Sequence, residues 1–473
     1  MPRYRPAAPG LIAALLAACL AACGSNSTGA PDAGEPDGGH DAGNPGIDAG
    51  HDAGTPEDAG TDAGMDAGLD AGLLSGHFIA GPGIAPGPYM GVHYSAGDIN
   101  GATDDAGTFS YPAGAQVDFS VGGLSLGTVP GAPVVTPFSL SGGCTITPQL
   151  TQLLVFLQSL DGDGNPANGV QLPAYPAVLS GSLASLTRAQ VAADIAQLSP
   201  GTTPVADQAA LDLFIMQVDG EAWTQQSMDT FDLLSSGIRS QGAATDGTDW
   251  LFSWRFGLSR TDMSYSVQVK NLEDIPALLL AQGSDHIGDI DVAGGWLYAG
   301  IEDSAHYQHP LIARYDPQSL DYQISFPIDV TKQPDGVPWV AYDGDADEAF
   351  SSPWSPSPGI NVFDGNDSMA FLRTIPLSPA LDRIQGAKLW HGFMYASADI
   401  SPLKTVWKIN LDTGTAMAVL QMDLGTVEEE GLVFLERGDG TAMHTMNANS
   451  GSTAMEFRHH ARTIPPLRDS ICP

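Results

Sequence analysis

The chain is poor in basic residues and in cysteine. Its 473 residues include 18 Lys and Arg against 55 Asp and Glu, which gives a formal net charge of −37 at pH 7. This charge argues against nucleic acid and other polyanions as partners, because like charges repel, whereas metal cations and cationic or neutral ligands are easier to accommodate. The sequence has no P-loop, no nicotinamide-binding fingerprint and no Cys-x-x-Cys motif, so the common signatures of nucleotide-binding and redox enzymes are missing.

The N-terminus has the features of an export signal. Arg3 and Arg5 precede an apolar stretch at residues 11–20, which is too short to span a bilayer, and small residues follow it. The run Leu-Ala-Ala-Cys that ends at Cys23 resembles the lipobox of bacterial lipoproteins. This resemblance implies a signal peptide at residues 1–22, a lipidated Cys23, and a place in the cell envelope, on the outer membrane or the cell surface. A similar run ends at Cys19, but Cys23 is preferred because a polar linker begins directly after it.

Residues 23–73 differ in composition from the rest of the chain. They repeat Asp-Ala-Gly units, and after Cys23 they contain eleven Asp or Glu and no Lys or Arg. Such a segment buries too little apolar surface to offset its chain entropy, so we predict a disordered tether that charge repulsion extends. Nonapeptide Ca²⁺-binding repeats would need apolar positions that stack into a β-solenoid, and Ala fills those positions here.

Residues 74–200 are predicted to form a β-sandwich-like domain with helices. Apolar and polar residues alternate around Gly turns in residues 89–94, 103–111 and 116–121, which is typical of hairpins. The Thr-Asp-x-x-Gly-x-Phe pattern that starts at Thr103 resembles small β-sandwich modules related to carboxypeptidase regulatory domains, and this implies a stalk or binding module. A helix is expected after Thr147, which caps it, with Pro148 at its first position and a leucine-rich face in the core.

A loop directly after this helix carries oxygen ligands at alternate positions. Asp161, Asp163 and Asn165 match the Asp-x-Asp-x-Asn start of an EF-hand loop, and hard cations such as Ca²⁺ require oxygen ligands. Pro166 stands where the motif has Gly, and Leu172 stands where it has a bidentate Glu. The sequence leaves a partial Ca²⁺ loop and a plain Asx-turn open as alternatives.

The remaining chain is predicted to be a helical connector with a closing strand, residues 201–238, and a β-propeller, residues 239–473. Helices are expected over residues 187–198 and 203–218, each with a Thr cap. From Arg239 onward similar segments recur at intervals of about 45 to 50 residues, and such a period with several short strands per unit indicates a propeller. Five units fit, and residues 232–238 supply a closing strand or part of a sixth blade, so we predict five or six blades.

The start of each repeat gives the innermost strand of a blade, so the predicted channel-lining residues are Gln241, His286, Asp289, Asp343, Gln385 and Glu430. Gly follows Gln241, Gln385 and Glu430 directly, which suits a crowded axis. Carboxylates and an imidazole that converge in a channel predict a metal site, and we assign Ca²⁺ to Glu430, His286 and Asp289.

The Glu-Gly pair at Glu430 resembles strand starts of metal-dependent propeller hydrolases, including calcium-dependent nucleotidases, phytases and lactonases. This resemblance implies a hydrolytic metal centre. The amides Gln241 and Gln385 depart from it, because those families generally use more carboxylates at the channel.

Two classes of function follow from the sequence. In the first, the chain is a lipid-anchored binding or interaction protein whose ligand, a small molecule, a glycan or a protein, stays unidentified. In the second, the propeller is a metal-dependent hydrolase of an extracytoplasmic phosphoester, lactone or glycan. The small number of carboxylates at the predicted channel favours the first class. Export also permits a disulfide between Cys144 and Cys472, whose pairing the sequence leaves open.

Overall fold

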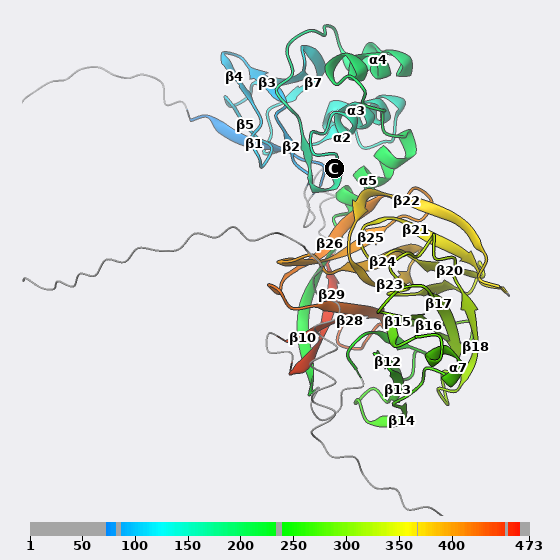
Figure 1. Ribbon diagram of the computed structural model, residues 1–473. Helices are drawn as coiled ribbons and strands as arrows, with labels where there is room; N and C mark the ends of the chain where they lie inside the picture. The colour runs from blue at the N-terminus through cyan, green and yellow to red at the C-terminus, as the bar shows by residue number, and fades with distance from the viewer. Residues whose placement is uncertain (1–71, 82–86, 233–238, 367, 450–452, 464–473) are drawn as a thin grey trace, which may run out of the picture.

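The computed structural model describes residues 72–81, 87–232, 239–366, 368–449 and 453–463, and Figure 1 traces the chain through them. Cys23, its alternative Cys19 and nearly all of the predicted tether lie outside these residues, so lipid anchoring stays a prediction. Cys472 also lies outside them, whereas Cys144 is described and is disulfide-bonded. In the described ranges, no helix combines the length and apolar character that a membrane span requires.

The chain is mainly β, as predicted, and its N-terminal part contains two small sheets and a two-stranded pair. One sheet has the order β4-β3-β6-β7, the other has the order β5-β1-β8, and β2 pairs with β9. Alternate residues of β6 are buried, because successive side chains of a strand face opposite sides. The strands are β1 (Leu74–Phe78), β2 (Tyr89–Met90), β3 (His93–Ala96), β4 (Ile99–Ala102), β5 (Thr108–Tyr111), β6 (Gln116–Val121), β7 (Leu124–Pro130), β8 (Val134–Val135) and β9 (Val170–Gln171).

The predicted helix after Thr147 is confirmed. Its start is fixed by the Thr147 side chain, which accepts a hydrogen bond from the Leu150 amide, and by Pro148 in the first turn. The helix expected over residues 203–218 begins later, at Asp207, and its cap is Ala206 instead of the predicted Thr203. The helices of this part are α2 (Pro137–Leu140), α3 (Pro148–Ser159), η1 (Pro166–Asn168), η2 (Leu183–Ser185), α4 (Arg188–Leu198) and α5 (Asp207–Asp219).

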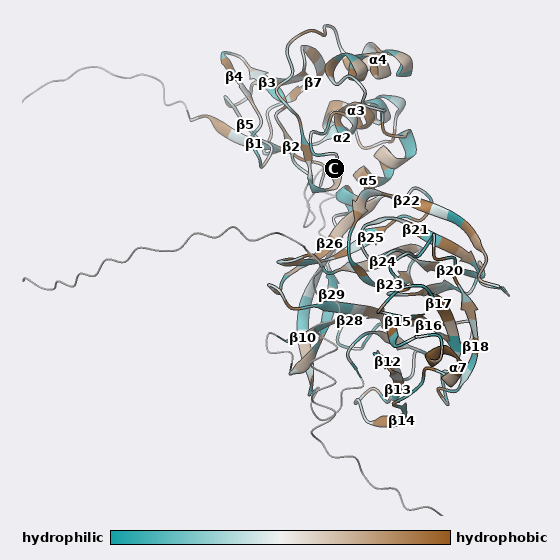
Figure 2. Ribbon diagram, viewed as in Figure 1, coloured by the Kyte–Doolittle hydropathy of each residue, from teal (hydrophilic) through white to brown (hydrophobic). Residues whose placement is uncertain are grey.

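The other strands form the predicted β-propeller. Five four-stranded antiparallel sheets follow one another between Ala222 and Thr463 in the described part of the chain. Most of their strands carry both hydrophobic and hydrophilic residues (Figure 2). The sheets are β11 (Ala243–Thr245), β12 (Trp250–Trp254), β13 (Gly257–Thr261), β14 (Val267–Asn271); β15 (His286–Ala293), β16 (Trp296–Glu302), β17 (Leu311–Tyr315), β18 (Tyr322–Pro327); β19 (Ala341–Asp343), β20 (Glu348–Ser351), β21 (Ser357–Asp364), β22 (Phe371–Leu381); β23 (Ile384–Trp390), β24 (Phe393–Ala398), β25 (Leu403–Ile409), β26 (Ala416–Asp423); and β27 (Glu429–Phe434), β28 (Thr441–Ala448), β29 (Ala454–Thr463), β10 (Ala222–Asp232). A short helix, α7 (Ala277–Leu280), lies between β14 and β15.

The first strands of the sheets pack around a common axis. β11 contacts β15, β15 contacts β19, β19 contacts β23, β23 contacts β27, and β27 returns to contact β11. The last sheet is completed by β10, which precedes the other propeller strands in the sequence and pairs antiparallel with β29. In the described residues this closing strand is Ala222–Asp232, earlier than the predicted 232–238, and residues 233–238 of that prediction lie outside the described ranges.

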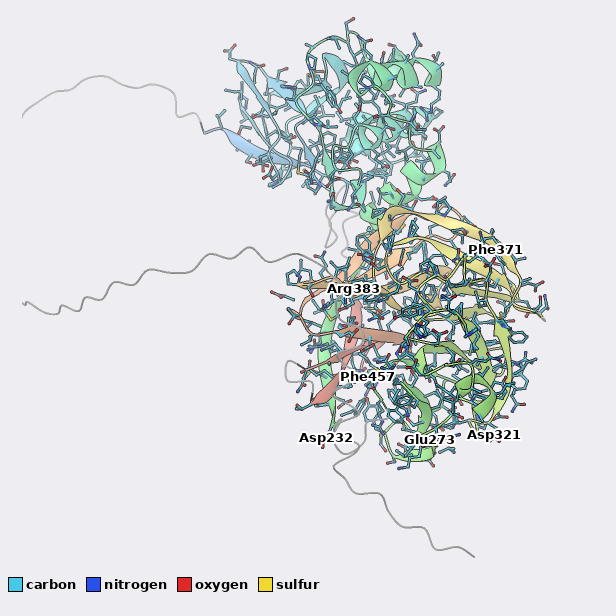
Figure 3. All side chains as sticks on the ribbon, in the orientation of Figure 1. Asp232, Glu273, Asp321, Phe371, Arg383 and Phe457 are labelled. Atoms are coloured by element: carbon cyan, nitrogen blue, oxygen red, sulfur yellow. The ribbon has the colours of Figure 1, made fainter. Side chains whose placement is uncertain are left out.

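A buried charged cluster joins the closing strand to the rest of the ring. Glu221, directly before β10, accepts hydrogen bonds from Lys408 and Arg462 at 2.7 and 2.8 Å and from the Tyr395 hydroxyl at 2.8 Å. Phe457 of β29, labelled in Figure 3, packs against Phe231 of β10 with ring centroids 6.0 Å apart. The ring is thus held at its seam by both an apolar contact and a satisfied buried carboxylate.

Candidate functional site at the channel entrance

Asp289 occupies the axis of the ring. Three glycines from other repeats lie against it, namely Gly242 directly before β11, Gly386 of β23 and Gly431 of β27, and a Cβ atom at Gly242 or Gly386 would come within 2.5 or 2.7 Å of an Asp289 carboxylate oxygen. A Cβ atom at Gly431 would come closer still. We call these four residues the axial layer. The expectation that glycine is needed at a crowded axis is confirmed, and the side chain that crowds it is Asp289.

The Asp289 carboxylate is already paired within the protein. Lys388 Nζ lies 2.5 Å from Asp289 Oδ2, and the Ala243 amide donates to Oδ1 at 3.2 Å. Both charged side chains are buried. Burial raises the pKa of Asp289 to about 7, although the Lys388 ammonium acts to lower it. The sequence analysis gave no role to Lys388, which lies inside β23 three residues after Gln385, because only the first polar residue of each repeat was expected near the axis.

His286 is also held by protein partners on both ring nitrogens. Nδ1 lies 2.9 Å from Glu302 Oε1, and Nε2 lies 2.6 Å from Gln241 Oε1. The Gln241 amide nitrogen donates to the Ser240 carbonyl at 3.0 Å, which orients its oxygen toward the ring. Both ring nitrogens of His286 therefore have a partner within the protein.

Three consecutive glutamates, Glu428, Glu429 and Glu430, stand at the start of β27, and we call them the glutamate row. Gln385 Nε2 donates to Glu428 Oε1 at 3.0 Å, and Glu428 is half-buried. Both carboxylate oxygens of Glu429 are buried and have no hydrogen-bond partner in the described residues. Glu430 is 4% exposed, and in the part of the chain that the structure describes its side chain makes no hydrogen bond.

Burial raises the pKa of all three glutamates, and nearby carboxylates raise it further. The pKa of Glu428 rises to about 7, and those of Glu429 and Glu430 rise well above the usual range. The neighbouring cations Arg383 and Lys404 act to lower the pKa of Glu428 but offset the increase only in part, because both pair with Asp399. Arg383 Nη2 lies 2.5 Å from Asp399 Oδ2, and the Lys404 ammonium pairs with Oδ1.

We call the region formed by the glutamate row with Gln241, His286 and Gln385 the entrance.

The structure therefore brings together four of the predicted channel residues and separates two. Gln241, His286, Gln385 and Glu430 lie at the entrance, and Asp289 lies in the axial layer. Within the described ranges no group of three or more His, Cys, Asp or Glu side chains has an arrangement that would hold a metal ion. The Ca²⁺ assignment to Glu430, His286 and Asp289 stays a prediction, with two of its three ligands engaged elsewhere.

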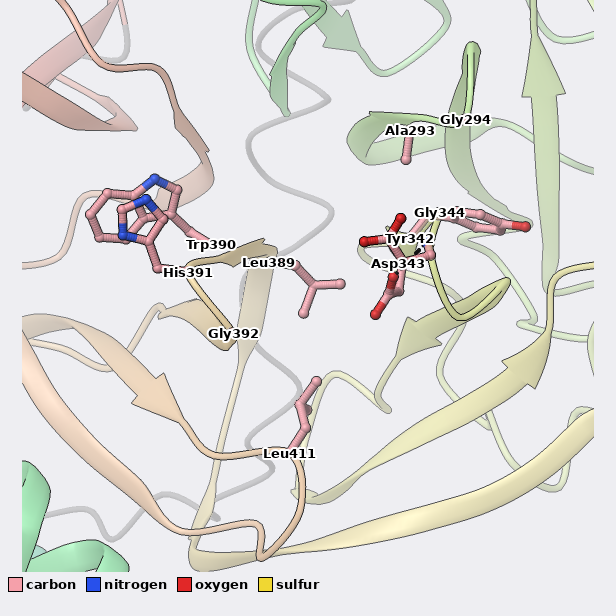
Figure 4. Close-up of a pocket in the computed structure, with 11 residues that line it drawn as sticks. Ala293, Gly294, Tyr342, Asp343, Gly344, Leu389, Trp390, His391, Gly392 and Leu411 are labelled. Atoms are coloured by element: carbon pink, nitrogen blue, oxygen red, sulfur yellow. Dashed lines mark hydrogen bonds between the residues drawn. The ribbon is translucent and has the colours of Figure 1, made fainter.

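Asp343 lies at the other end of the first strands. It is the last residue of β19, and its Oδ1 accepts hydrogen bonds from the amides of Asp345 and Ala346 at 2.8 and 3.1 Å. It lines a pocket of ≈ 480 Å³ (Figure 4), in which the stacked rings of Trp390 and His391 stand across from it. The remaining lining includes Leu389 and Leu411.

The Asp161 loop has Asx-turn hydrogen bonds and two unused oxygens. Asp161 Oδ1 accepts from the Gln171 amide, and Asp163 Oδ1 accepts from the Asn165 amide, both at 2.8 Å. Asp161 Oδ2 and Asn165 Oδ1 are buried without a partner among the described residues. Burial, together with Asp163, raises the pKa of Asp161 to about 7. Pro166 starts the short helix η1 and so turns the chain away from an EF-hand path.

No family model matches the sequence, and no curated protein is similar enough to count as a relative. Among solved structures, the chain is similar to Myxococcus xanthus glutaminyl cyclase, with 12% identity and a TM-score of 0.38 over 52% of this chain and 97% of that chain. It is also similar to the PQQ-bound aldose sugar dehydrogenase from Streptomyces coelicolor, with 12% identity and a TM-score of 0.31 over 51% of this chain and 98% of that chain. Both are β-propeller proteins. Similarity at this level does not bear on function.

Proposed function

We propose that this chain is a lipid-anchored binding protein of the cell envelope, on the outer membrane or the cell surface. Cys23 attaches it to the membrane, and the acidic tether of residues 23–73 holds the folded part at a distance. The lipobox and the composition of the tether support this part of the proposal. The N-terminal sheets serve as a carboxypeptidase-regulatory-like stalk, and nucleic acid is not a partner, given the net charge of −37.

In this proposal the propeller has five blades and binds its ligand, a small molecule, a glycan or a protein, at the entrance. The contact between β27 and β11 and the completion of the last sheet by β10 support five blades.

We propose binding instead of hydrolysis because the side chains of Asp289 and His286 are already paired with other groups of the protein. Lys388 neutralises the Asp289 carboxylate, and Glu302 and Gln241 occupy both nitrogens of His286. A metal ion that took Asp289 as a ligand would leave the buried Lys388 ammonium unpaired, and breaking a buried pair in this way costs about 3–5 kcal/mol.

The alternative is a metal-dependent hydrolase of an extracytoplasmic phosphoester, lactone or glycan. The glutamate row favours it, because carboxylate oxygens without a cationic partner are suitable ligands for Ca²⁺. A separate structural Ca²⁺ in the loop of Asp161, Asp163 and Asn165 is compatible with either function, and the two unpartnered oxygens there support it.

The test is thermal unfolding of the full-length protein in detergent, with chelator and then with added Ca²⁺, combined with turnover assays on phosphoester and lactone substrates. We expect no turnover, and we expect any chelator effect to survive Glu430→Gln and to vanish in the Asp161→Asn, Asp163→Asn double variant. Ca²⁺-dependent turnover that Glu430→Gln abolishes would replace the binding proposal with the hydrolase.

A further inference from the structure

Two buried histidines lie in direct contact at the seam of the ring, where β10 pairs with β29. Nδ1 of His444 in β28 lies 2.7 Å from Nδ1 of His459 in β29. The other ring nitrogen of each histidine faces an oxygen atom. His444 Nε2 lies 3.0 Å from the Leu435 carbonyl oxygen, which follows β27. His459 Nε2 lies 3.0 Å from Asp229 Oδ2 of β10. We call these four groups and their three contacts the seam chain.

The seam chain has more contacts than two neutral imidazole rings can serve. A carbonyl oxygen and an ionised carboxylate oxygen only accept hydrogen bonds, so each of the three contacts needs a proton on a ring nitrogen. A neutral imidazole ring carries one N–H group. Two neutral rings therefore leave one contact without a proton, and one further proton completes the chain.

We propose that the seam chain is a proton switch built into the closure of the ring, in which His459 takes up one proton as the pH falls and then donates to Asp229. This inference goes beyond the proposed function, which concerns the entrance. Protonated His459 donates through Nε2 to Asp229 and through Nδ1 to His444. His444 stays neutral and donates through Nε2 to the Leu435 carbonyl. The Asp229 side chain is 45% exposed, so the proton reaches the chain from solvent at this end.

The hydroxyl group of Tyr265 responds to the same proton. Tyr265 lies between β13 and β14, and its hydroxyl oxygen lies 2.7 Å from Asp229 Oδ2 and 3.3 Å from His459 Nε2. The hydroxyl has one proton, which it donates to one of these two acceptors at a time. When His459 is neutral, its bare Nε2 competes for that proton. When His459 is protonated, Nε2 becomes a donor, and the hydroxyl donates to Asp229. Protonation therefore directs hydrogen bonds from both the first sheet and β29 to the closing strand.

The surroundings place the proton on His459 instead of His444. Burial lowers the pKa of His444 to about 3, although its contact with the Leu435 carbonyl acts to raise it. Burial also lowers the pKa of His459, but there the Asp229 carboxylate opposes the decrease. His459 is therefore expected to take up its proton below the ordinary imidazole value of about 6.5. The other ionisable groups around the seam chain are Arg437 and Asp439 between β27 and β28, Arg458 and His460 of β29, and Arg239 before β11.

The experiment is NMR of the full-length protein in detergent between pH 4.5 and pH 8. The histidine rings carry ¹⁵N, which reports the ring nitrogens that are protonated, and the tyrosine carbon that bears the hydroxyl carries ¹³C. His459→Gln, His444→Gln and Tyr265→Phe assign the signals. Asp229→Asn removes the charge of the carboxylate and keeps an oxygen acceptor. His391→Gln is the control, because the His391 side chain is 59% exposed and lies outside the seam chain.

We expect both nitrogens of His459 to become protonated below about pH 6.5, while His444 keeps a proton on Nε2 alone. The Tyr265 carbon signal should shift with the same midpoint. Asp229→Asn is expected to lower this midpoint by about one pH unit or more, because an opposite charge next to the imidazolium is lost. His391→Gln should leave the midpoint unchanged.

The titration of the wild-type protein decides the inference even where a variant fails to fold. A His459 ring that keeps one protonation state from pH 4.5 to pH 8, or a proton that is taken up by His444 instead, overturns the inference. A Tyr265 carbon signal that does not follow the titration of His459 also overturns it. An unchanged midpoint in folded Asp229→Asn has the same consequence.

Discussion

Lys388 and Asp289 are 99 positions apart in the sequence, and their side chains form an ion pair of 2.5 Å on the axis of the ring. β15 supplies the carboxylate and β23 supplies the ammonium, and these two first strands contact each other across the axis. Glycines from other repeats leave the space that Asp289 fills. The pair therefore depends on the closure of the ring.

Replacing Lys388 with Met is expected to destabilise the protein by about 3–5 kcal/mol at pH 9, because the buried Asp289 carboxylate loses its cation. The loss of stability caused by Lys388→Met is expected to be smaller at pH 6 than at pH 9. Burial raises the pKa of folded Asp289, Lys388 acts to lower it, and without the lysine the folded pKa lies further above the unfolded value. An acid whose folded pKa is raised loses stability as the pH rises. Urea denaturation at the two pH values measures the difference.

The double variant Lys388→Met, Asp289→Asn removes both charges and is expected to recover part of the lost stability at pH 9. Equal stability of the single variant and the wild type at both pH values would show that the pair does not hold the axis.

Adding a methyl group to the axial layer is expected to destabilise the ring. Gly431→Ala should cost about 1–3 kcal/mol, because its Cβ meets the Asp289 carboxylate and the Cα atom of Gly242. Gly438→Ala is the matched control, since a Cβ there meets nothing within 4 Å. Chemical denaturation of the two variants gives the comparison. The double variant Asp289→Ala, Gly431→Ala should remove the steric part of this cost. Equal losses of stability in Gly431→Ala and Gly438→Ala would contradict the close contact between Gly431 and Asp289.

Because the pKa values in the glutamate row are raised, we expect the free energy of unfolding to fall as the pH rises above about 5. Burial raises the pKa of Glu428 from 4.5 to about 7 and that of Glu430 well above 4.5. Between the unfolded and folded pKa values the folded protein binds more protons, so the free energy of unfolding decreases with increasing pH. Urea denaturation from pH 5 to pH 8.5 measures this slope, and Glu430→Gln should make it shallower. The same slope in wild type and variant would show that Glu430 stays ionised.

Membrane attachment is expected to depend on the thiol of Cys23, because only a thiol at the cleavage site accepts the lipid. Cys23→Ser should leave the protein unprocessed or release it from membranes, as measured by palmitate labelling and fractionation. Cys19→Ser is the control and should behave as wild type. Labelling that persists in Cys23→Ser and disappears in Cys19→Ser would identify Cys19 as the lipidation site.

Local sequence patterns predicted the elements that depend on near neighbours along the chain. The Thr147 cap, Pro148 and the leucine spacing predicted helix α3, because capping and amphipathic burial act within a few residues. The repeat period predicted the series of four-stranded sheets, since each repeat encodes one unit of the same kind. The second connecting helix shows the limit of such patterns, because Thr203 looked like a cap and the helix begins at Asp207.

The sequence by itself determined which polar residues begin each repeat and therefore which ones gather near the axis. Only the tertiary structure decided their partners, because ring closure brings Lys388 to Asp289 and Gln385 to Glu428 from separate sheets, and the pairing of β15 with β16 brings Glu302 to His286. The first strands of the repeats also differ in how they pair with their neighbours, because some contain register shifts and others do not. Register shifts in β15, β23 and β27 accompany the approach of Asp289 to Gly386 and Gly431, whereas Asp343 ends β19, whose pairing with β20 has no shift, at the other end of the first strands. The spacing of residues along the chain does not show where such shifts occur in the pairing of neighbouring strands.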